Sequence, residues 1–66
     1  IHQRHGDPKI GIDLEMLGAI HERQGEYAAA LEKYQQAKNI FRQAGMTPDK
    51  DRMDRHIARV RGKMGK

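Results

Sequence analysis

Basic side chains that could bind an anion are concentrated in the last third of this chain. Residues 47–66 carry seven Lys or Arg against three Asp, whereas residues 1–46 carry six basic and six acidic residues, so the last third supplies the whole net charge of +4. These basic residues include Arg52, Arg55, Arg59 and Lys63. Clustered basic groups attract carboxylates and phosphates alike. The pattern indicates an anionic partner, unless the charges only keep a helix surface solvated.

The side chains that catalysis or metal binding would need are nearly absent. The 66 residues include no cysteine, no serine and a single threonine. We therefore expect no enzyme activity, no catalytic residue and no cofactor. His2 and His5 could share a metal ion on a helix, but structural zinc usually takes four ligands and no Asp or Glu completes a convincing set. We expect no metal site, and we interpret His21 as a packing residue.

The first predicted element is a helix over residues 8–24. Asp7 is suited to cap its N-terminus, and Pro8 suits the first helical position, where a missing N–H costs nothing. Gly25 is a typical stop because glycine tolerates a positive φ. Within these limits the side chains that recur at helical spacing are Ile10, Leu14, Leu17 and His21.

Two more helices are predicted, over residues 26–44 and 48–63. The first carries an apolar stripe made of Tyr27, Ala30, Leu31, Tyr34, Ala37, Ile40, Phe41 and Ala44. It ends at Gly45, and its short linker to the preceding helix requires antiparallel packing. The last helix has Thr47 as its predicted N-cap, and its thinner stripe consists of Met53, Ile57, Val60 and Met64. The four methionines, Met16, Met46, Met53 and Met64, are expected to fill the core.

The chain repeats itself at an offset of forty residues. Pro8, Leu17, Gly18, Ile20 and Gly25 align with Pro48, Ile57, Ala58, Val60 and Gly65. Similarity at helix starts, packing positions and turns is typical of helix-pair solenoids. We expect residues 1–6 to be the tail of a preceding repeat, residues 7–45 one full helix pair, and residues 47–66 the first or capping helix of the next repeat. The chain is accordingly expected to be a piece of a longer protein.

The helix pair resembles the tetratricopeptide repeat family. The residues that carry the resemblance are Leu14, Leu17-Gly18, Gly25-Glu26-Tyr27, Ala30, Tyr34 and Ala37, within residues 11–44. His21 stands where the family usually has Tyr, and the repeat of about forty residues is longer than the usual ~34. The resemblance implies an all-α, antiparallel helix-turn-helix repeat. It also implies a non-catalytic scaffold for protein–protein interaction, and it explains Gly18 as a small residue against which the second helix packs.

The resemblance also implies a binding surface. In this family the inner face of the first helix of each pair lines a groove, which here would comprise Ile12, Glu15, Ala19, Glu22 and Arg23. The matching face of the last helix would comprise Arg52, Arg55, Arg59 and Lys63. A groove with one mixed and one basic wall suits an acidic peptide or helix of a partner protein. The pattern that clamps a C-terminal carboxylate is absent, because Glu15 and Ala19 stand at two of its places.

A basic nucleic-acid-binding domain that uses the last helix is the alternative. Arg61 adds to its basic residues, and the sequence pI is about 9.8. Against this, no aromatic residue is interleaved there for base stacking, and three Asp share the helix. No apolar run approaches the ~18 residues of a membrane span, and we expect no membrane association. Exposed repeat ends predict self-association. With no signal peptide visible, a cytoplasmic location is the default expectation.

Overall fold

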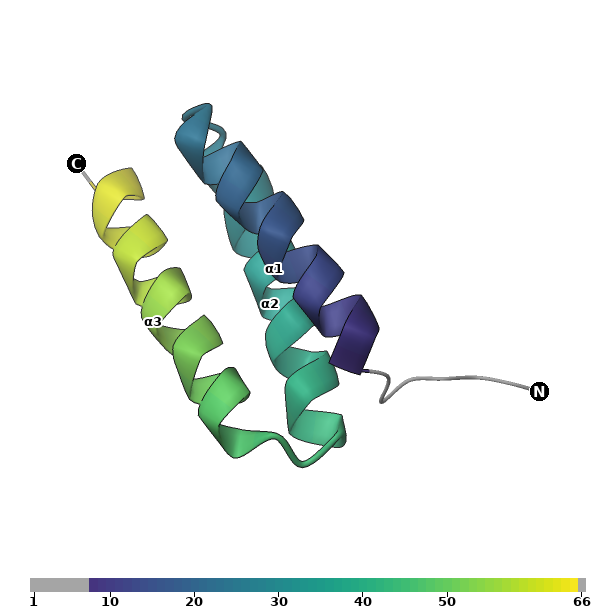
Figure 1. The fold of residues 1–66 in the computed structure, drawn as a ribbon. Coiled ribbons are helices and arrows are strands. Elements are labelled where there is room, and N and C mark those ends of the chain that lie inside the picture. Colours follow the sequence, from purple (N-terminus) through teal and green to yellow (C-terminus); the bar gives the residue numbers. More distant parts are fainter. Residues whose placement is uncertain (1–7, 66) are drawn as a thin grey trace.

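The computed structural model describes residues 8–65, which form three α-helices. These are α1 (Pro8–Arg23), α2 (Tyr27–Gln43) and α3 (Thr47–Met64), and the described residues include no strand. Consecutive helices run antiparallel, and α2 packs against both of the others (Figure 1). The all-α class is confirmed, and each helix boundary lies within one residue of its predicted position.

Each turn between helices is closed by a glycine with positive φ. Gly25 has φ 78° and Gly45 has φ 75°, a region that other residues rarely adopt. After α1, the Gly25 N–H donates to the Glu22 carbonyl at 3.1 Å and the Glu26 N–H donates to the His21 carbonyl at 2.9 Å. The turn after α2 has the same two hydrogen bonds at the same lengths. Both turns are therefore Schellman motifs, which explains the abrupt reversals of direction.

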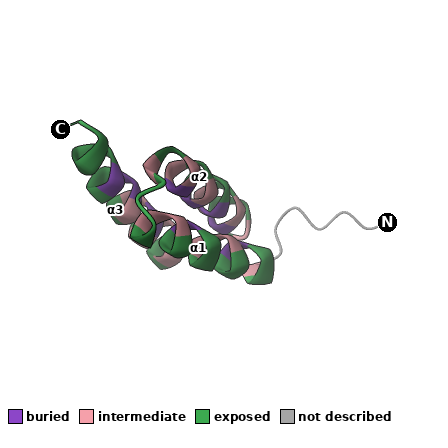
Figure 2. Ribbon diagram, turned by 90° about the horizontal axis from the view of Figure 1, so that it is seen from above, coloured by how far each residue is buried: buried purple, intermediate pink, exposed green. Residues whose placement is uncertain are grey.

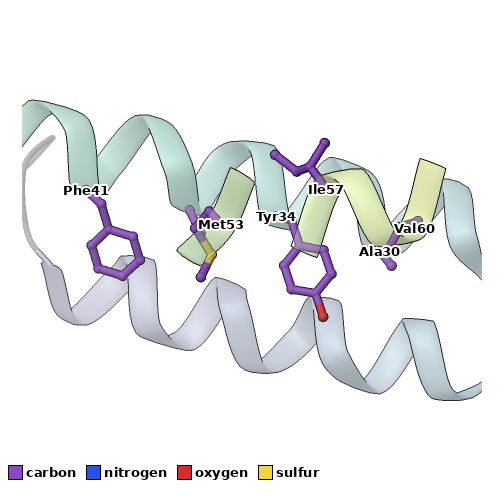
Figure 3. Packing of buried hydrophobic residues seen from close by; sticks show 7 residues of the cluster. Ala30, Tyr34, Phe41, Met53, Ile57 and Val60 are labelled. Atoms are coloured by element: carbon purple, nitrogen blue, oxygen red, sulfur yellow. The ribbon is translucent and has the colours of Figure 1, made fainter. Parts of the chain in front are cut away.

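Two glycines of α1 allow aromatic rings of α2 to approach its backbone. A Cβ atom at Gly18 would lie 2.8 Å from Cε1 of Tyr34, and a Cβ atom at Gly11 would lie 3.0 Å from Cε1 of Phe41. Both rings point from α2 toward α1 (Figure 3). The role expected of Gly18 is confirmed. Gly11, two turns earlier in the helix, has the same packing role.

The core lies mainly between α2 and α3. Its buried side chains are Ala30, Tyr34, Ala37 and Phe41 of α2 with Met53, Ile57 and Val60 of α3. Figure 2 shows these buried segments turned toward the interior of the three-helix arrangement. The stripe predicted for α2 is thus buried at its centre, and three of the four residues predicted for α3 are buried. Burial of this apolar surface is the main term that holds the helices together.

The structure corrects three details of the prediction. The stripe on α1 is only partly buried, since Leu14 packs against the core while Ile10 and Leu17 are exposed. Met16 and Met64 are also exposed, so they do not fill the core. The N-cap of α3 is Met46 rather than Thr47, which is the first helical residue, and no side chain caps this end. The predicted cap Asp7 and the predicted repeat tail over residues 1–6 lie outside the described residues.

Candidate functional site

Two carboxylates of α1 face α3, and each binds one arginine through both oxygens. Arg52 donates from Nε to Glu15 Oε2 at 2.9 Å and from Nη2 to Glu15 Oε1 at 2.8 Å. Arg59 binds Glu22 in the same way, at 2.7 Å for both bonds. Both pairs join residues 37 positions apart, which requires α1 and α3 to run in parallel. These bidentate bonds connect two helices that otherwise pack mainly on α2.

Of the two carboxylates, Glu22 has the larger set of hydrogen-bond partners. Besides Arg59, it accepts hydrogen bonds from Tyr34 Oη at 3.0 Å and from Lys63 Nζ at 3.1 Å. The Arg59 hydrogen bond is the main cause that lowers the pKa of Glu22 to about 2. Burial, followed by the Glu22 carboxylate, raises the pKa of Tyr34 to about 12. The cluster therefore holds Glu22 ionised and Tyr34 protonated through the physiological pH range.

His56 links the two ion pairs into one set of contacting side chains between α1 and α3, which we call the ion-pair layer. Its ring stacks on Tyr34, with 4.7 Å between the ring centroids. Its Nδ1 lies 2.9 Å from Nη2 of Arg59, and its Nε2 lies 3.1 Å from Oε2 of Glu15. A guanidinium can only donate, so Nδ1 must accept and the ring proton must sit on Nε2, from which it donates to Glu15. His56 thus bridges the two ion pairs, accepting at Nδ1 from Arg59 and donating from Nε2 to Glu15.

The structure brings together five of the nine residues predicted to line a groove. These five are Glu15, Glu22, Arg52, Arg59 and Lys63, and they bind one another across the space between α1 and α3. The other four, Ile12, Ala19, Arg23 and Arg55, are exposed and take no part in this layer. The basic wall predicted on α3 is thus largely neutralised by carboxylates of its own chain.

Sequence reasoning missed two residues of this layer, Tyr34 and His56. Tyr34 was expected as a core residue, which it is, but its hydroxyl reaches through to Glu22. His56 stands four residues after Arg52 and three before Arg59, so helical periodicity alone places it on the same face. That spacing is the signal that could have found it. His21, expected to be a packing residue, is partly buried, and its Nδ1 lies 2.7 Å from Glu26 Oε1.

A second surface consists of large apolar side chains that α1 leaves exposed. We call it the α1 apolar face, and it comprises Ile10, Ile12, Met16, Leu17 and Ile20. Every one of these side chains is more than two-fifths exposed. One residue of the predicted groove, Ile12, belongs to it. The glycines that contact α2 lie on another side of the helix, so no described element covers this face.

Residues 8–65 contain no group of three or more His, Cys, Asp or Glu side chains arranged to hold a metal ion, and the pair His2 and His5 lies outside them. Of the three helices described, none combines the length and the apolar composition that a membrane crossing requires. Comparison with protein-family models, with curated proteins and with solved structures finds no match to this chain.

Proposed function

We propose that this chain is a tetratricopeptide-like interaction scaffold, without catalytic activity, that binds an α-helix of a partner protein through the α1 apolar face. The proposal rests on an exposed apolar surface of a kind that commonly marks a protein-interaction site. It also rests on the forty-residue internal repeat, because the repeat aligns residues of the α1 apolar face with buried residues of α3.

One comparison between α1 and α3 carries the proposal. Leu17 and Ile20 of α1 are 44% and 48% exposed. The residues forty positions later, Ile57 and Val60 of α3, are 8% and 0% exposed because they pack against α2. The two residues of α3 are therefore covered by α2, whereas the corresponding two residues of α1 are uncovered. A helix that packs on α1 as α2 packs on α3 would cover Leu17 and Ile20 in the same way.

The α2 helix indicates what kind of partner helix would fit. Its packing stripe alternates small and aromatic residues, and Ala30, Tyr34, Ala37 and Phe41 are all fully buried. A second copy of the chain cannot offer its α2 stripe, since its own α2 already contacts both α1 and α3. The proposed partner is therefore a separate amphipathic helix with small and aromatic residues at helical spacing.

An acidic peptide at the inner face predicted from the sequence has less support. Such a peptide would compete with Glu15 and Glu22, which already bind Arg52, Arg59 and Lys63. Displacing a carboxylate that forms bidentate bonds within the same chain is unfavourable, because that carboxylate is already held in place. The apolar face requires no such displacement.

The nucleic-acid alternative is weakened by the same ion pairs. Three basic side chains of α3 are bound to α1, and the rings of Tyr34 and Phe41 are buried rather than available for base stacking. Titration of a mixed-sequence oligonucleotide at ~50 and ~200 mM salt tests this alternative. Tight binding with a steep salt dependence would favour it over the scaffold proposal.

The scaffold proposal is tested with a labelled peptide that has the sequence of residues 27–43, offered in trans to the 66-residue chain. Fluorescence anisotropy should show saturable binding. The double substitution Leu17→Glu/Ile20→Glu should weaken that binding at least about tenfold, since each apolar contact contributes on the order of 1.5 kcal/mol or more.

The control for this experiment is Arg55→Gln, a change to an exposed residue of α3 on the predicted inner face. Arg55 has no ion pair within residues 8–65, and its substitution should leave peptide affinity unchanged. Circular dichroism should show that both variants keep the helical content of the parent. Equal affinity of the peptide for the parent and for Leu17→Glu/Ile20→Glu would contradict the proposal.

A further inference from the structure

A groove runs between α2 and α3 on the flank of α3 that does not face α1. Its volume is about 670 Å³, and its lining residues from α2 are Gln35, Lys38, Asn39 and Arg42. Its lining residues from α3 are Asp54, Ile57, Ala58 and Arg61. None of them belongs to the ion-pair layer or to the α1 apolar face, so this groove is a separate surface.

The charges of the groove are not balanced internally. Lys38 and Asp54 form an ion pair at 2.8 Å near its middle. Arg42 and Arg61 are exposed, and within residues 8–65 neither has a carboxylate partner. This contrasts with Arg52 and Arg59 on the other flank of α3, where each guanidinium is held by a carboxylate of α1. The groove therefore retains two cations that a ligand can neutralise.

The antiparallel register of α2 and α3 separates these two cations along the groove. Because Lys38 lies opposite Asp54, the residue of α2 opposite Arg61 is close to position 31, eleven residues from Arg42. Eleven residues of helix span about 16 Å, or three turns. Carboxylates eleven positions apart on a third helix would lie on one face at the same spacing.

The floor of the groove is apolar and shallow. Ile57 lies under it, almost fully buried, and Ala58 presents a single methyl group. Ala58 aligns, at the forty-residue offset, with Gly18, the position where the Tyr34 ring of α2 packs on the α1 backbone. A small residue at this point allows a helix to approach, and the amides of Gln35 and Asn39 supply hydrogen-bonding groups along one rim.

We propose that this groove binds an acidic amphipathic helix of a partner protein, with an apolar stripe over Ile57 and Ala58 and carboxylates at Arg42 and Arg61. Separated guanidinium groups, polar rims and an apolar floor match such a helix in charge and shape. No aromatic ring lines the groove, which disfavours stacked bases of a nucleic acid.

The test uses the 66-residue chain and a designed helical peptide as probe. The peptide carries a leucine stripe and two glutamates eleven positions apart, and a matched peptide has glutamine at both places. At low salt the acidic peptide should bind the parent chain more tightly than the glutamine peptide does. The double substitution Arg42→Gln/Arg61→Gln should weaken binding of the acidic peptide about five- to tenfold, the sum expected of two exposed ion pairs.

Two further variants establish where the peptide binds. Ala58→Phe places a ring on the exposed floor without changing charge and should abolish binding of the acidic peptide, with unchanged helical content. Arg55→Gln removes an exposed arginine elsewhere on α3 and should leave the affinity within about twofold of the parent. Retained binding by Ala58→Phe, or an equal loss in Arg55→Gln, would overturn the assignment.

Two further binding measurements distinguish this groove from the α1 apolar face and from a nucleic-acid site. Leu17→Glu/Ile20→Glu should bind the acidic peptide as the parent does. The proposal for the groove and the proposal for the α1 apolar face can therefore be contradicted independently. A mixed-sequence oligonucleotide that binds more tightly than the acidic peptide and loses affinity in Arg42→Gln/Arg61→Gln would also overturn the proposal, since phosphate would then be the preferred ligand.

Discussion

At the scale of single residues, Glu22 shows how one side chain joins all three helices. It lies on α1, accepts bonds from Arg59 and Lys63 of α3, and accepts a third from Tyr34 of α2. Its side chain is only 10% exposed, whereas that of Arg59 is 45% exposed. The ion pair is therefore partly screened by water, and its contribution is smaller than that of a fully buried pair.

The stability contributed by Glu22 should depend on pH. Its folded-state pKa of about 2 lies below the ordinary value of 4.5. A lowered carboxyl pKa stabilises the fold above the unfolded-state pKa, and this contribution is lost as pH falls from about 4.5 to about 2. We expect Glu22→Gln to reduce the free energy of unfolding by about 1–2 kcal/mol at pH 7 and by little at pH 2.

Urea denaturation of the parent and of Glu22→Gln at several pH values measures this difference. Glu32→Gln is the matched control, because Glu32 is exposed on α2 and forms no ion pair within residues 8–65. It should shift the free energy of unfolding by less than about 0.5 kcal/mol at every pH. A difference between parent and Glu22→Gln that stays constant from pH 7 to pH 2 would contradict the role assigned to Glu22.

At the scale of elements, α1 depends on glycine for its contact with α2. Each glycine in a helix costs roughly 1 kcal/mol relative to alanine. At Gly11 and Gly18 the cost is offset because the rings of Phe41 and Tyr34 pack directly on the α1 backbone. Ring-to-backbone contact at these two glycines is therefore one of the interactions that hold the hairpin together.

Enlarging either side of this contact should destabilise the hairpin. Gly18→Leu and Ala30→Leu should each lower the free energy of unfolding by roughly 1–3 kcal/mol, because both positions are buried and lack room for extra methylenes. Gly62→Ala is the control, since a Cβ there meets nothing within 4 Å. It should stabilise the protein by up to about 1 kcal/mol. Unchanged melting temperatures for both leucine variants would refute the packing described.

At the scale of the whole molecule, a small core coexists with a large uncovered apolar surface. A chain of 66 residues buries a modest fraction of its surface. The α1 apolar face remains exposed on one flank, opposite in character to the polar groove between α2 and α3. Apolar surface left uncovered in this way drives association.

We therefore predict that the isolated chain self-associates when its concentration is raised. Two copies would pack their α1 apolar faces together, more weakly than a well-matched partner helix would bind. Sedimentation velocity should show a sedimentation coefficient that increases with concentration, and Ile20→Glu should shift the protein toward the monomer. A monomer at every concentration tested would count against this prediction.

The helices themselves could be predicted from local signals. Pro8, Gly25 and Gly45 mark starts and stops through backbone chemistry that acts within a few residues, and the observed boundaries follow them closely. The apolar stripe of α2 could also be predicted, because helical periodicity gathers its apolar residues on one face. The packing role of Gly18 followed from the resemblance to a known repeat and is confirmed in the structure.

The binding surfaces depend on contacts between residues distant in sequence. The resemblance to a known repeat predicted that Glu15 and Glu22 share one face of α1 and that the arginines share one face of α3. It could not show that these faces meet and neutralise each other, because that depends on how both helices pack on α2. The same packing leaves Leu17 and Ile20 exposed while it buries Ile57 and Val60.

The sequence by itself determined three helices, two tight turns and a basic last third, because capping, glycine conformation and charge are local properties. Tertiary structure decided which of those charges remain available. It pairs Arg52 and Arg59 with carboxylates of α1, whereas Arg61, at the edge of a groove, has no carboxylate partner within residues 8–65. The physical reason is that an ion pair requires two side chains within a few ångströms, and only the packed arrangement of helices sets that distance.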